Sequence, residues 1–355
     1  MSFDRKALMQ VAMQRRWDAY YSSVETLIER DDRRSVRRKL EFINRVPDDG
    51  VRAGFLDKYL SRLEAQAGKL SGEEASDYLS ILYILKKYTA LSDNWEKLET
   101  VLPDASRRFF GNHLKQDTAT PTDVTEPTWC LGLSKTGTNS FHGYMENLGL
   151  SSQHFLNDVT KTIISPEDCM LFDSVSDTPV VHIARRDGIP DNVQVVASIR
   201  GFGAWEKSFL NHFRGYFVDS PDAATPTFDA MKEKFFDGTP FMYGQTWWDL
   251  HHDLYFRHGS AREAFDSHAD WIGDLSTRLG DRCLVLPIEA ADKASQVSQF
   301  MGANTPVLDY PHRNNRGSAS GPLERLRKAL KAGLGWGAKK SHRPMVSGAA
   351  PAPSD

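Results

Sequence analysis

The sequence predicts an α/β fold, a mostly parallel central sheet flanked by helices, with an N-terminal all-helical region. Three observations support this. From Thr128 onward, short apolar runs alternate with helical patterns, as in a sheet whose parallel strands are joined by covering helices. One apolar run ends in a glycine- and hydroxyl-rich turn that opens a helix. Residues 1–120, in contrast, show apolar residues at helical spacing and no strand pattern.

The composition is that of an ordinary globular protein. Its 355 residues are 40% hydrophobic and 26% charged, which is within the usual range. The net charge of −3 argues against a chain devoted to nucleic acid. The three cysteines lie far apart beside apolar runs, which excludes a CxxC metal site and predicts buried, reduced thiols at Cys130, Cys169 and Cys283.

The sequence shows no segment that would carry the chain into or across a membrane. No apolar run approaches the roughly 20 residues that a membrane-spanning helix needs. The residues from Met1 to Lys6 lack the apolar stretch of a signal peptide. We therefore expect a cytoplasmic protein.

The N-terminal region carries two local signals that divide its helices. Pro47 to Gly50 is a turn signature, and Ser71 followed by Glu74 is a helix-capping signal. The basic run from Arg33 to Lys39 is interpreted as a solvated helix face balanced by nearby acidic residues. A partner-binding or substrate-presenting role for the region stays open.

The expected division of the chain follows from changes in composition. A polar segment with two prolines, residues 121–127, predicts a linker. It would separate a helical region, residues 1–120, from an α/β domain over residues 128–316, followed by a tail over residues 317–355.

Within the α/β domain, four apolar runs are the expected strands: Trp129–Leu133, Met170–Phe172, Val193–Ile199 and Cys283–Leu286. The expected helices are Asn139–Leu148, Pro179–Arg186, Ala204–Phe213, Ser260–Leu279 and Ala291–Met301. Ligands of such sheets bind at the carboxyl ends of the strands. The loops after Leu133, Phe172 and Ile199 should therefore converge on one site.

The turn after the first expected strand carries the strongest functional signal. A strand that breaks at Gly132 and opens a helix presents unpaired N–H groups and the positive end of the helix dipole, a natural seat for phosphate or sulfate. Lys135 adds a mobile positive charge. The candidate ligand-binding residues are Ser134, Lys135, Thr136, Gly137, Thr138, Asn139 and Ser140. The alternative is a strand-to-helix turn that binds nothing.

The spacing within this turn separates two kinds of phosphate loop. Gly132 and Gly137 have the separation found in nucleoside-triphosphatase loops, but Thr138 stands where those loops have lysine, and the lysine is displaced to Lys135. The order resembles the 5′-phosphosulfate loop of the sulfotransferases, whose pattern runs close to Gly-x-x-Lys-Thr-Gly-Thr-Thr/Ser-Ser. Asn139 departs from that pattern and keeps a polar side chain without the hydroxyl.

A second signal follows the strand expected at Val193–Ile199. This strand delivers Arg200 to its carboxyl end, and Ser208 lies on the helix that follows. Arginine suits bidentate phosphate contact, although an arginine can also merely cap a strand end. The run resembles the 3′-phosphate motif of the sulfotransferases, in which a serine follows the arginine by eight residues. Gly201 and Phe202 replace the usual Asp-Pro of that motif.

Two further segments, residues 172–180 and 309–314, resemble parts of a branch of the same family, so the resemblance covers about residues 128–315. It implies the P-loop-like sulfotransferase fold and transfer of a sulfuryl group from 3′-phosphoadenosine 5′-phosphosulfate (PAPS) to an acceptor hydroxyl or amine, leaving adenosine 3′,5′-bisphosphate (PAP). It also implies that Lys135 stabilises charge at the 5′-phosphate, that Arg200 and Ser208 hold the 3′-phosphate, and that no metal is required. Arg313 is a further candidate contact to the cofactor.

The acceptor needs a general base within hydrogen-bond reach. Asp173 and Asp177 follow the strand expected at Met170–Phe172, so they are the leading candidates. Asp177 is equally suited to cap the following helix. His182, on that helix, is the next candidate, against the alternative of a core or surface histidine. Three histidines in the run from His251 to His258 lack a recognisable metalloenzyme spacing: His251, His252 and His258.

The sequence does not identify the acceptor, although a carbohydrate or glycoconjugate is favoured. Trp205, Trp247 and Trp248 would suit a sugar-stacking cleft, but core packing explains them equally. Two alternatives to the sulfotransferase remain. One is a P-loop kinase that uses a nucleoside triphosphate, and the other is a non-catalytic nucleotide-binding scaffold.

The tail contains a basic amphipathic helix expected at Pro322–Leu334, whose leucines share one face. Such a helix can lie on an anionic membrane surface or an acidic partner, which would place the protein at the inner face of the membrane. It can equally pack its leucines against the domain. Residues 348–355 are rich in alanine and proline and are expected to be disordered.

Overall fold

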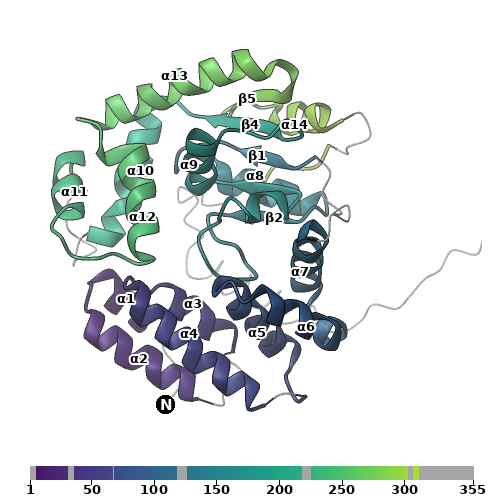
Figure 1. Cartoon of the computed structure of the whole chain (residues 1–355). Coiled ribbons are helices and arrows are strands. Elements are labelled where there is room, and N and C mark those ends of the chain that lie inside the picture. The colour runs from purple at the N-terminus through teal and green to yellow at the C-terminus, as the bar shows by residue number, and fades with distance from the viewer. Residues whose placement is uncertain are drawn as a thin grey trace, which may run out of the picture. The chain divides into compact units, whose positions relative to one another are not determined.

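The computed structural model describes residues 5–30, 36–66, 68–117, 126–217, 225–302 and 307–311 (Figure 1). Residues Met1–Arg313 form one compact unit. Most of the expected linker, the expected tail helix, His312 and Arg313 lie outside the described residues. Within the described part of the chain, no helix combines the length and the apolar character needed to cross a membrane.

The described N-terminal region is helical, as predicted. Its capping signal is confirmed: the Glu74 carboxylate accepts a hydrogen bond of 2.8 Å from the Ser71 N–H, and the Ser71 hydroxyl accepts one of 3.4 Å from the Glu74 N–H. At the turn signature from Pro47 to Gly50, Asp48 caps the helix that follows. Its side chain accepts a hydrogen bond of 2.8 Å from the Val51 N–H. The helices are α1 (Arg5–Met13), α2 (Trp17–Glu29), α3 (Val36–Asn44), α4 (Asp49–Glu64), α5 (Gly72–Ile84), α6 (Tyr88–Leu98) and α7 (Asp104–Asp117), with a 3₁₀ turn at Glu99–Val101.

The α/β part is built on a five-stranded sheet in the order β2-β3-β1-β4-β5. Its pairs are all parallel, which confirms the predicted class. Thr128 in β1 pairs with Ser174 in β3 on one side and with Gln194 in β4 on the other. The strands are β1 (Thr128–Cys130), β2 (Ser152–His154), β3 (Ser174–Ser176), β4 (Gln194–Ile199) and β5 (Cys283–Pro287).

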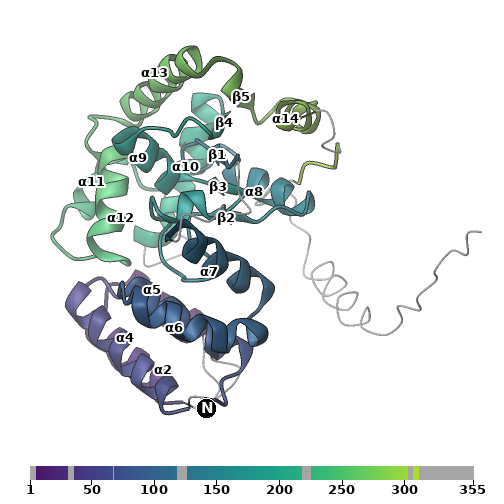
Figure 2. The same ribbon diagram turned by 45° about the vertical axis from the view of Figure 1, so that its right-hand side comes forward.

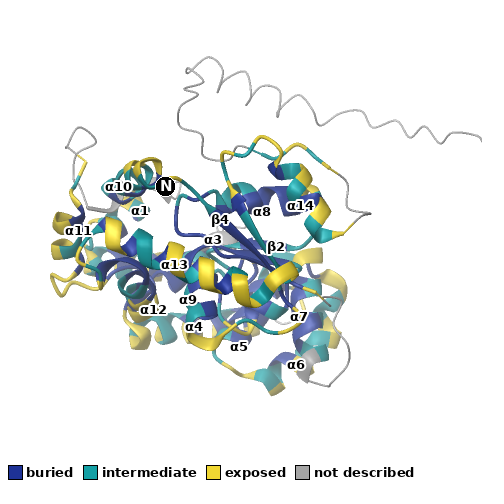
Figure 3. Cartoon of the chain, turned by 90° about the horizontal axis from the view of Figure 1, so that it is seen from above, coloured by how far each residue is buried: buried dark blue, intermediate teal, exposed yellow. Residues whose placement is uncertain are grey.

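Helices cover both faces of this sheet. Successive strand residues point to opposite faces, so Cys130 and Val196 join one apolar cluster, with α8 and α14, whereas Trp129 and Val195 join the main core. Figure 3 shows β4 mostly dark blue between helices whose outer faces are yellow. The helices are α8 (Thr138–Asn147), α9 (Thr178–Asp187), α10 (Phe202–Phe217), α11 (Phe228–Phe235), α12 (Gly244–His251), α13 (Ala261–Leu279) and α14 (Lys293–Met301).

One expected strand is wrong and one observed strand was not expected. Residues Asp168–Met170 form a 3₁₀ turn, and β3 begins only at Ser174. Phe172 is buried because it stacks on Phe109 of α7, with ring centroids 5.4 Å apart, and not because it lies in a strand. The unexpected strand, β2, contains the polar residues Ser152–His154.

The helical region and the sheet share one core. Figures 1 and 2 show α7 between the other N-terminal helices and the strands. The loop after β2 is bonded directly to the helices. Asn44 Nδ2 donates to the Thr160 carbonyl at 2.8 Å, and the Tyr83 hydroxyl donates to Asp168 Oδ1 at 3.2 Å. The helical region therefore fixes the loop that leads away from the carboxyl end of β2.

Candidate active site

The turn after β1 has an unusual backbone conformation. Gly137 precedes α8 with φ of +95°, and Lys135 has φ of +75°. A positive φ is costly for a residue with a side chain and persists where the surroundings enforce it, often at functional sites. Gly132 and Gly137, the two glycines of the turn, leave no room for a side chain. A Cβ at Gly132 would lie 2.2 Å from Ser198 Oγ, and one at Gly137 would lie 2.7 Å from Ile288 Cγ2.

Arg200 reaches this loop from the neighbouring strand. It follows β4, and its Nη1 donates to the Lys135 carbonyl at 3.3 Å. Its Nε lies 3.5 Å from Glu289 Oε1, an ion-pair distance, yet this buried N–H makes no hydrogen bond. A buried donor without an acceptor is costly. The Arg200 guanidinium therefore fits an anionic ligand at the carboxyl edge of β1 and β4.

Part of the loop backbone is already bonded within the protein. The Ser134 N–H donates to the Tyr255 hydroxyl at 2.9 Å, and the Thr136 N–H donates to the Leu133 carbonyl at 3.1 Å. Thr138 and Asn139 open α8, so their N–H groups have no carbonyl one turn earlier to bond. The expected anion seat is therefore restricted to the N–H groups at the start of α8, where the helix dipole is positive.

Two of the expected hydroxyl ligands also have partners in the protein. Thr136 Oγ1 donates to the Leu133 carbonyl at 2.8 Å and lies 3.1 Å from Ser198 Oγ. This side chain therefore stabilises the loop and connects it to β4. Thr138 Oγ1 lies 3.1 Å from His154 Nε2. Ser140 is half-buried in the first turn of α8.

A histidine–aspartate pair stands beside the loop. His154 ends β2 and Asp177 follows β3, and His154 Nε2 lies 3.1 Å from Asp177 Oδ2. Asp177 also caps α9, accepting from the Thr178 N–H at 2.8 Å, with φ of +86°. A carboxylate in this position orients the imidazole ring and stabilises its protonated form. Sequence reasoning missed His154 because the short polar run that contains it gives no strand signal.

Asp173 lies at the opposite edge of the sheet. It precedes β3, and its carboxylate accepts from Ser151 N at 2.7 Å, from Ser151 Oγ at 2.8 Å and from Arg108 Nη2 at 2.9 Å. The expectation that Asp173 follows its strand is wrong, because the apolar residues before it pack against α7. The carboxylate ties α7 to the amino ends of the strands.

The other expected site residues lie in different surroundings. Ser208 is half-buried on α10, and no described hydrogen bond joins it to Arg200. His182 Nδ1 lies 3.1 Å from Asp253 Oδ2. His251 is buried against the Trp247 carbonyl, and burial lowers its pKa to about 4, so it is neutral near pH 7. Among the described residues no group of three His, Cys, Asp or Glu side chains could hold a metal ion.

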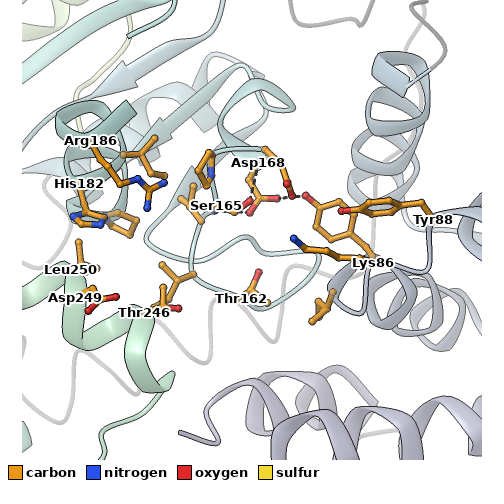
Figure 4. A pocket seen from close by; sticks show the side chains of 18 residues that line it. Lys86, Tyr88, Thr162, Ser165, Asp168, His182, Arg186, Thr246, Asp249 and Leu250 are labelled. Atoms are coloured by element: carbon orange, nitrogen blue, oxygen red, sulfur yellow. Dashed lines mark hydrogen bonds between the residues drawn. The ribbon is translucent and has the colours of Figure 1, made fainter. Parts of the chain in front are cut away.

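A separate cavity of about 430 Å³ lies between α9, α12, the loop at residues 162–168 and the turn after α5. Figure 4 shows Lys86 and Tyr88 on one side of it and His182, Arg186 and Asp249 on the other. None of its lining residues belongs to the phosphate loop, and Arg200 is not among them. The cavity is therefore distinct from the anion seat.

Comparison with protein families gives one match. The model of a family described as a sulfotransferase domain matches residues 129–319, more than half of the 355-residue chain. The matched range includes the loop after β1, the end of β4, and both members of the histidine–aspartate pair. Among curated proteins, none matches the chain.

Proposed function

The chain belongs to the sulfotransferase family, and from this premise we propose that it moves a sulfuryl group from PAPS to a hydroxyl or amine of a carbohydrate or glycoconjugate. The observation that carries the proposal is the pairing of two anion-binding groups on adjacent strands. The loop around Lys135 follows β1, and Arg200, with its unsatisfied Nε, follows β4. Two such groups suit a donor that carries both a 5′- and a 3′-phosphate.

In this proposal the protein positions the reactants and neutralises the leaving phosphate. PAPS supplies a sulfuryl group whose bond to the 5′-phosphate oxygen breaks as the acceptor oxygen or nitrogen bonds to sulfur, in line with the leaving oxygen. Lys135 and the N-terminus of α8 stabilise the charge that develops on that phosphate. Arg200 holds the 3′-phosphate, with Ser208 as its expected partner from α10.

In this mechanism His154 donates its Nε2–H to the Asp177 carboxylate, and the acceptor proton passes to the other ring nitrogen, Nδ1. Thr138, the first residue of α8, lies 3.1 Å from His154 Nε2, so the imidazole stands beside the anion seat. Asp177 orients the ring and stabilises the imidazolium that forms. This assignment keeps Asp177 in the site as a positioning group and leaves Asp173 out of it.

Calorimetric titration with PAP tests the proposal. We expect the wild type to bind, and Lys135→Ala or Arg200→Ala to bind about 10- to 100-fold more weakly, the loss expected for one charge-assisted contact. Lys86→Ala is the matched control, because this exposed lysine lies at the separate cavity. A wild type that does not bind PAP, or unchanged binding in both site variants, would contradict the proposal.

The preference for a carbohydrate acceptor is supported by the aromatic surface of α12. Trp248 is half-exposed and stacks on His252, with ring centroids 4.7 Å apart. Gln245 and Asp249, which share a hydrogen bond of 2.6 Å, lie on the same helix. Aromatic faces next to amide and carboxylate groups are typical of surfaces that bind amphipathic polyols. Transfer of labelled sulfate to oligosaccharides, compared with a panel of phenols and amines, tests this preference.

A further inference from the structure

A buried tyrosine holds the phosphate loop from a distant part of the chain. Tyr255 lies in the π-helical turn His252–Phe256, which directly follows α12. Such turns are rare and occur frequently at functional sites. The Tyr255 hydroxyl accepts the Ser134 N–H at 2.9 Å, although the two residues are 121 positions apart. The ring is fully buried, and burial raises the pKa of Tyr255, so the hydroxyl stays neutral at physiological pH.

The peptide groups around Lys135 are fixed by three side chains from outside the loop. Tyr255 holds the Ser134 N–H, and the Trp205 Nε1–H donates to the Ser134 carbonyl at 2.9 Å. Arg200 Nη1 donates to the Lys135 carbonyl at 3.3 Å. The φ and ψ of Lys135 are set by the orientation of the peptide groups on either side of it. The Trp205 and Arg200 contacts hold the two peptide groups that flank Lys135 and so support its positive φ, whereas the Tyr255 contact holds the preceding peptide group, between Leu133 and Ser134.

From this geometry we infer that Tyr255 is a positioning residue for donor binding: its hydroxyl fixes the Ser134 backbone and so keeps Lys135 directed at the anion seat. The inference rests on the proposed function of the loop. It assigns to the π-helical turn a role that the phosphate motif itself does not contain. Because Tyr255 packs against Phe209, with ring centroids 4.7 Å apart, its ring has support that does not depend on the hydroxyl.

Tyr255→Phe removes the hydroxyl and keeps this packing. We expect PAP to bind about tenfold more weakly, because the Ser134 N–H loses its acceptor and the loop can move. We also expect a lower kcat with the KM for the acceptor nearly unchanged. Tyr20→Phe is the matched control: it removes another buried hydroxyl, which donates to the Phe42 carbonyl at 2.9 Å in the N-terminal region. Thermal melting of both ligand-free variants measures the purely structural cost.

Weaker PAP binding in Tyr255→Phe, with no change in Tyr20→Phe at a similar melting temperature, would support the inference. Equal PAP affinities in all three proteins, or equal weakening in both variants, would overturn it while leaving the proposed function intact. Absence of binding by the wild type would overturn both. If Tyr255→Phe does not fold, Trp205→Phe removes the other hydrogen bond to Ser134. Unchanged PAP affinity in that variant would overturn the inference.

Discussion

Asp173 and Asp177 lie four residues apart in sequence, at opposite ends of β3, and their surroundings differ completely. At the amino edge, Asp173 is bonded to Ser151 and to the arginine of α7. At the carboxyl edge, Asp177 adopts a positive φ and contacts a histidine. Lys135 and Phe155, at the same edge, also have positive φ. A carboxylate bonded to fixed donors on relaxed backbone stabilises the fold, whereas one on strained backbone beside a titratable ring belongs to the site.

The largest effect should come from the charge at the carboxyl edge. Lys135→Ala should lower kcat/KM by about 10²- to 10⁴-fold, because the leaving phosphate loses a positioned cation. Lys161→Ala is the control, since Lys161 also has a positive φ, +59°, but pairs with Asp158 outside the site. Steady-state rates with labelled donor measure both. Equal losses in the two variants would mean that the backbone strain alone, and not the charge, matters.

Asp177→Asn should have the next largest effect. An asparagine can still cap α9 but cannot stabilise a protonated His154, so kcat should fall by about 10²-fold. His154→Ala should fall at least as far, and the double variant should lose little more than His154→Ala alone, because the two residues act as one unit. Fully additive losses of kcat in the double variant would contradict the proposal that Asp177 acts through His154.

Asp77 tests whether a carboxylate that is buried, but lies on regular helical backbone, contributes to catalysis. It lies on α5 and accepts from the Tyr59 hydroxyl at 2.9 Å, and burial raises its pKa to about 7. Since the folded state holds this proton more tightly than the unfolded state, stability should fall as pH rises from about 4 to 7, by up to about 1.4 kcal/mol per pH unit. Asp77→Asn should remove that slope in urea unfolding and leave kcat unchanged. A kcat that falls with Asp77→Asn would contradict the distinction between carboxylates that stabilise the fold and carboxylates that belong to the site.

The smallest effect is expected at the amino edge. Asp173→Asn should cost about 1 kcal/mol of unfolding free energy, because the bonds to Ser151 and Arg108 weaken but are not all lost. The kcat should not change. Urea unfolding and steady-state rates on the same preparation separate the two quantities. A kcat loss comparable to that of Asp177→Asn would remove the contrast between the two edges.

The parts of the fold and site that could be predicted are those that depend on residue patterns within a short stretch of sequence. The apolar run of β4 predicted both a buried strand and the place of Arg200, and the order of residues around Lys135 predicted a turn that opens a helix, as α8 shows. Anion binding by that turn stays a prediction. His154 and Tyr255 could not be found this way. The β2 strand is polar and short, and the π-helical turn of Tyr255 meets Ser134 only through the tertiary fold. Asp173 was expected after a strand because Phe172 is apolar, but Phe172 packs against Phe109 of α7 and does not lie in a strand.

The apolar core runs without interruption from Tyr20 in α2, through Phe109 and Phe172, to Val195 in β4. A core of this kind couples the parts that share it, so neither can lose its packing without exposing apolar surface of the other. The helical region and the sheet should accordingly melt in a single cooperative transition. The sheet thus derives part of its thermal resistance from its packing against the helical region.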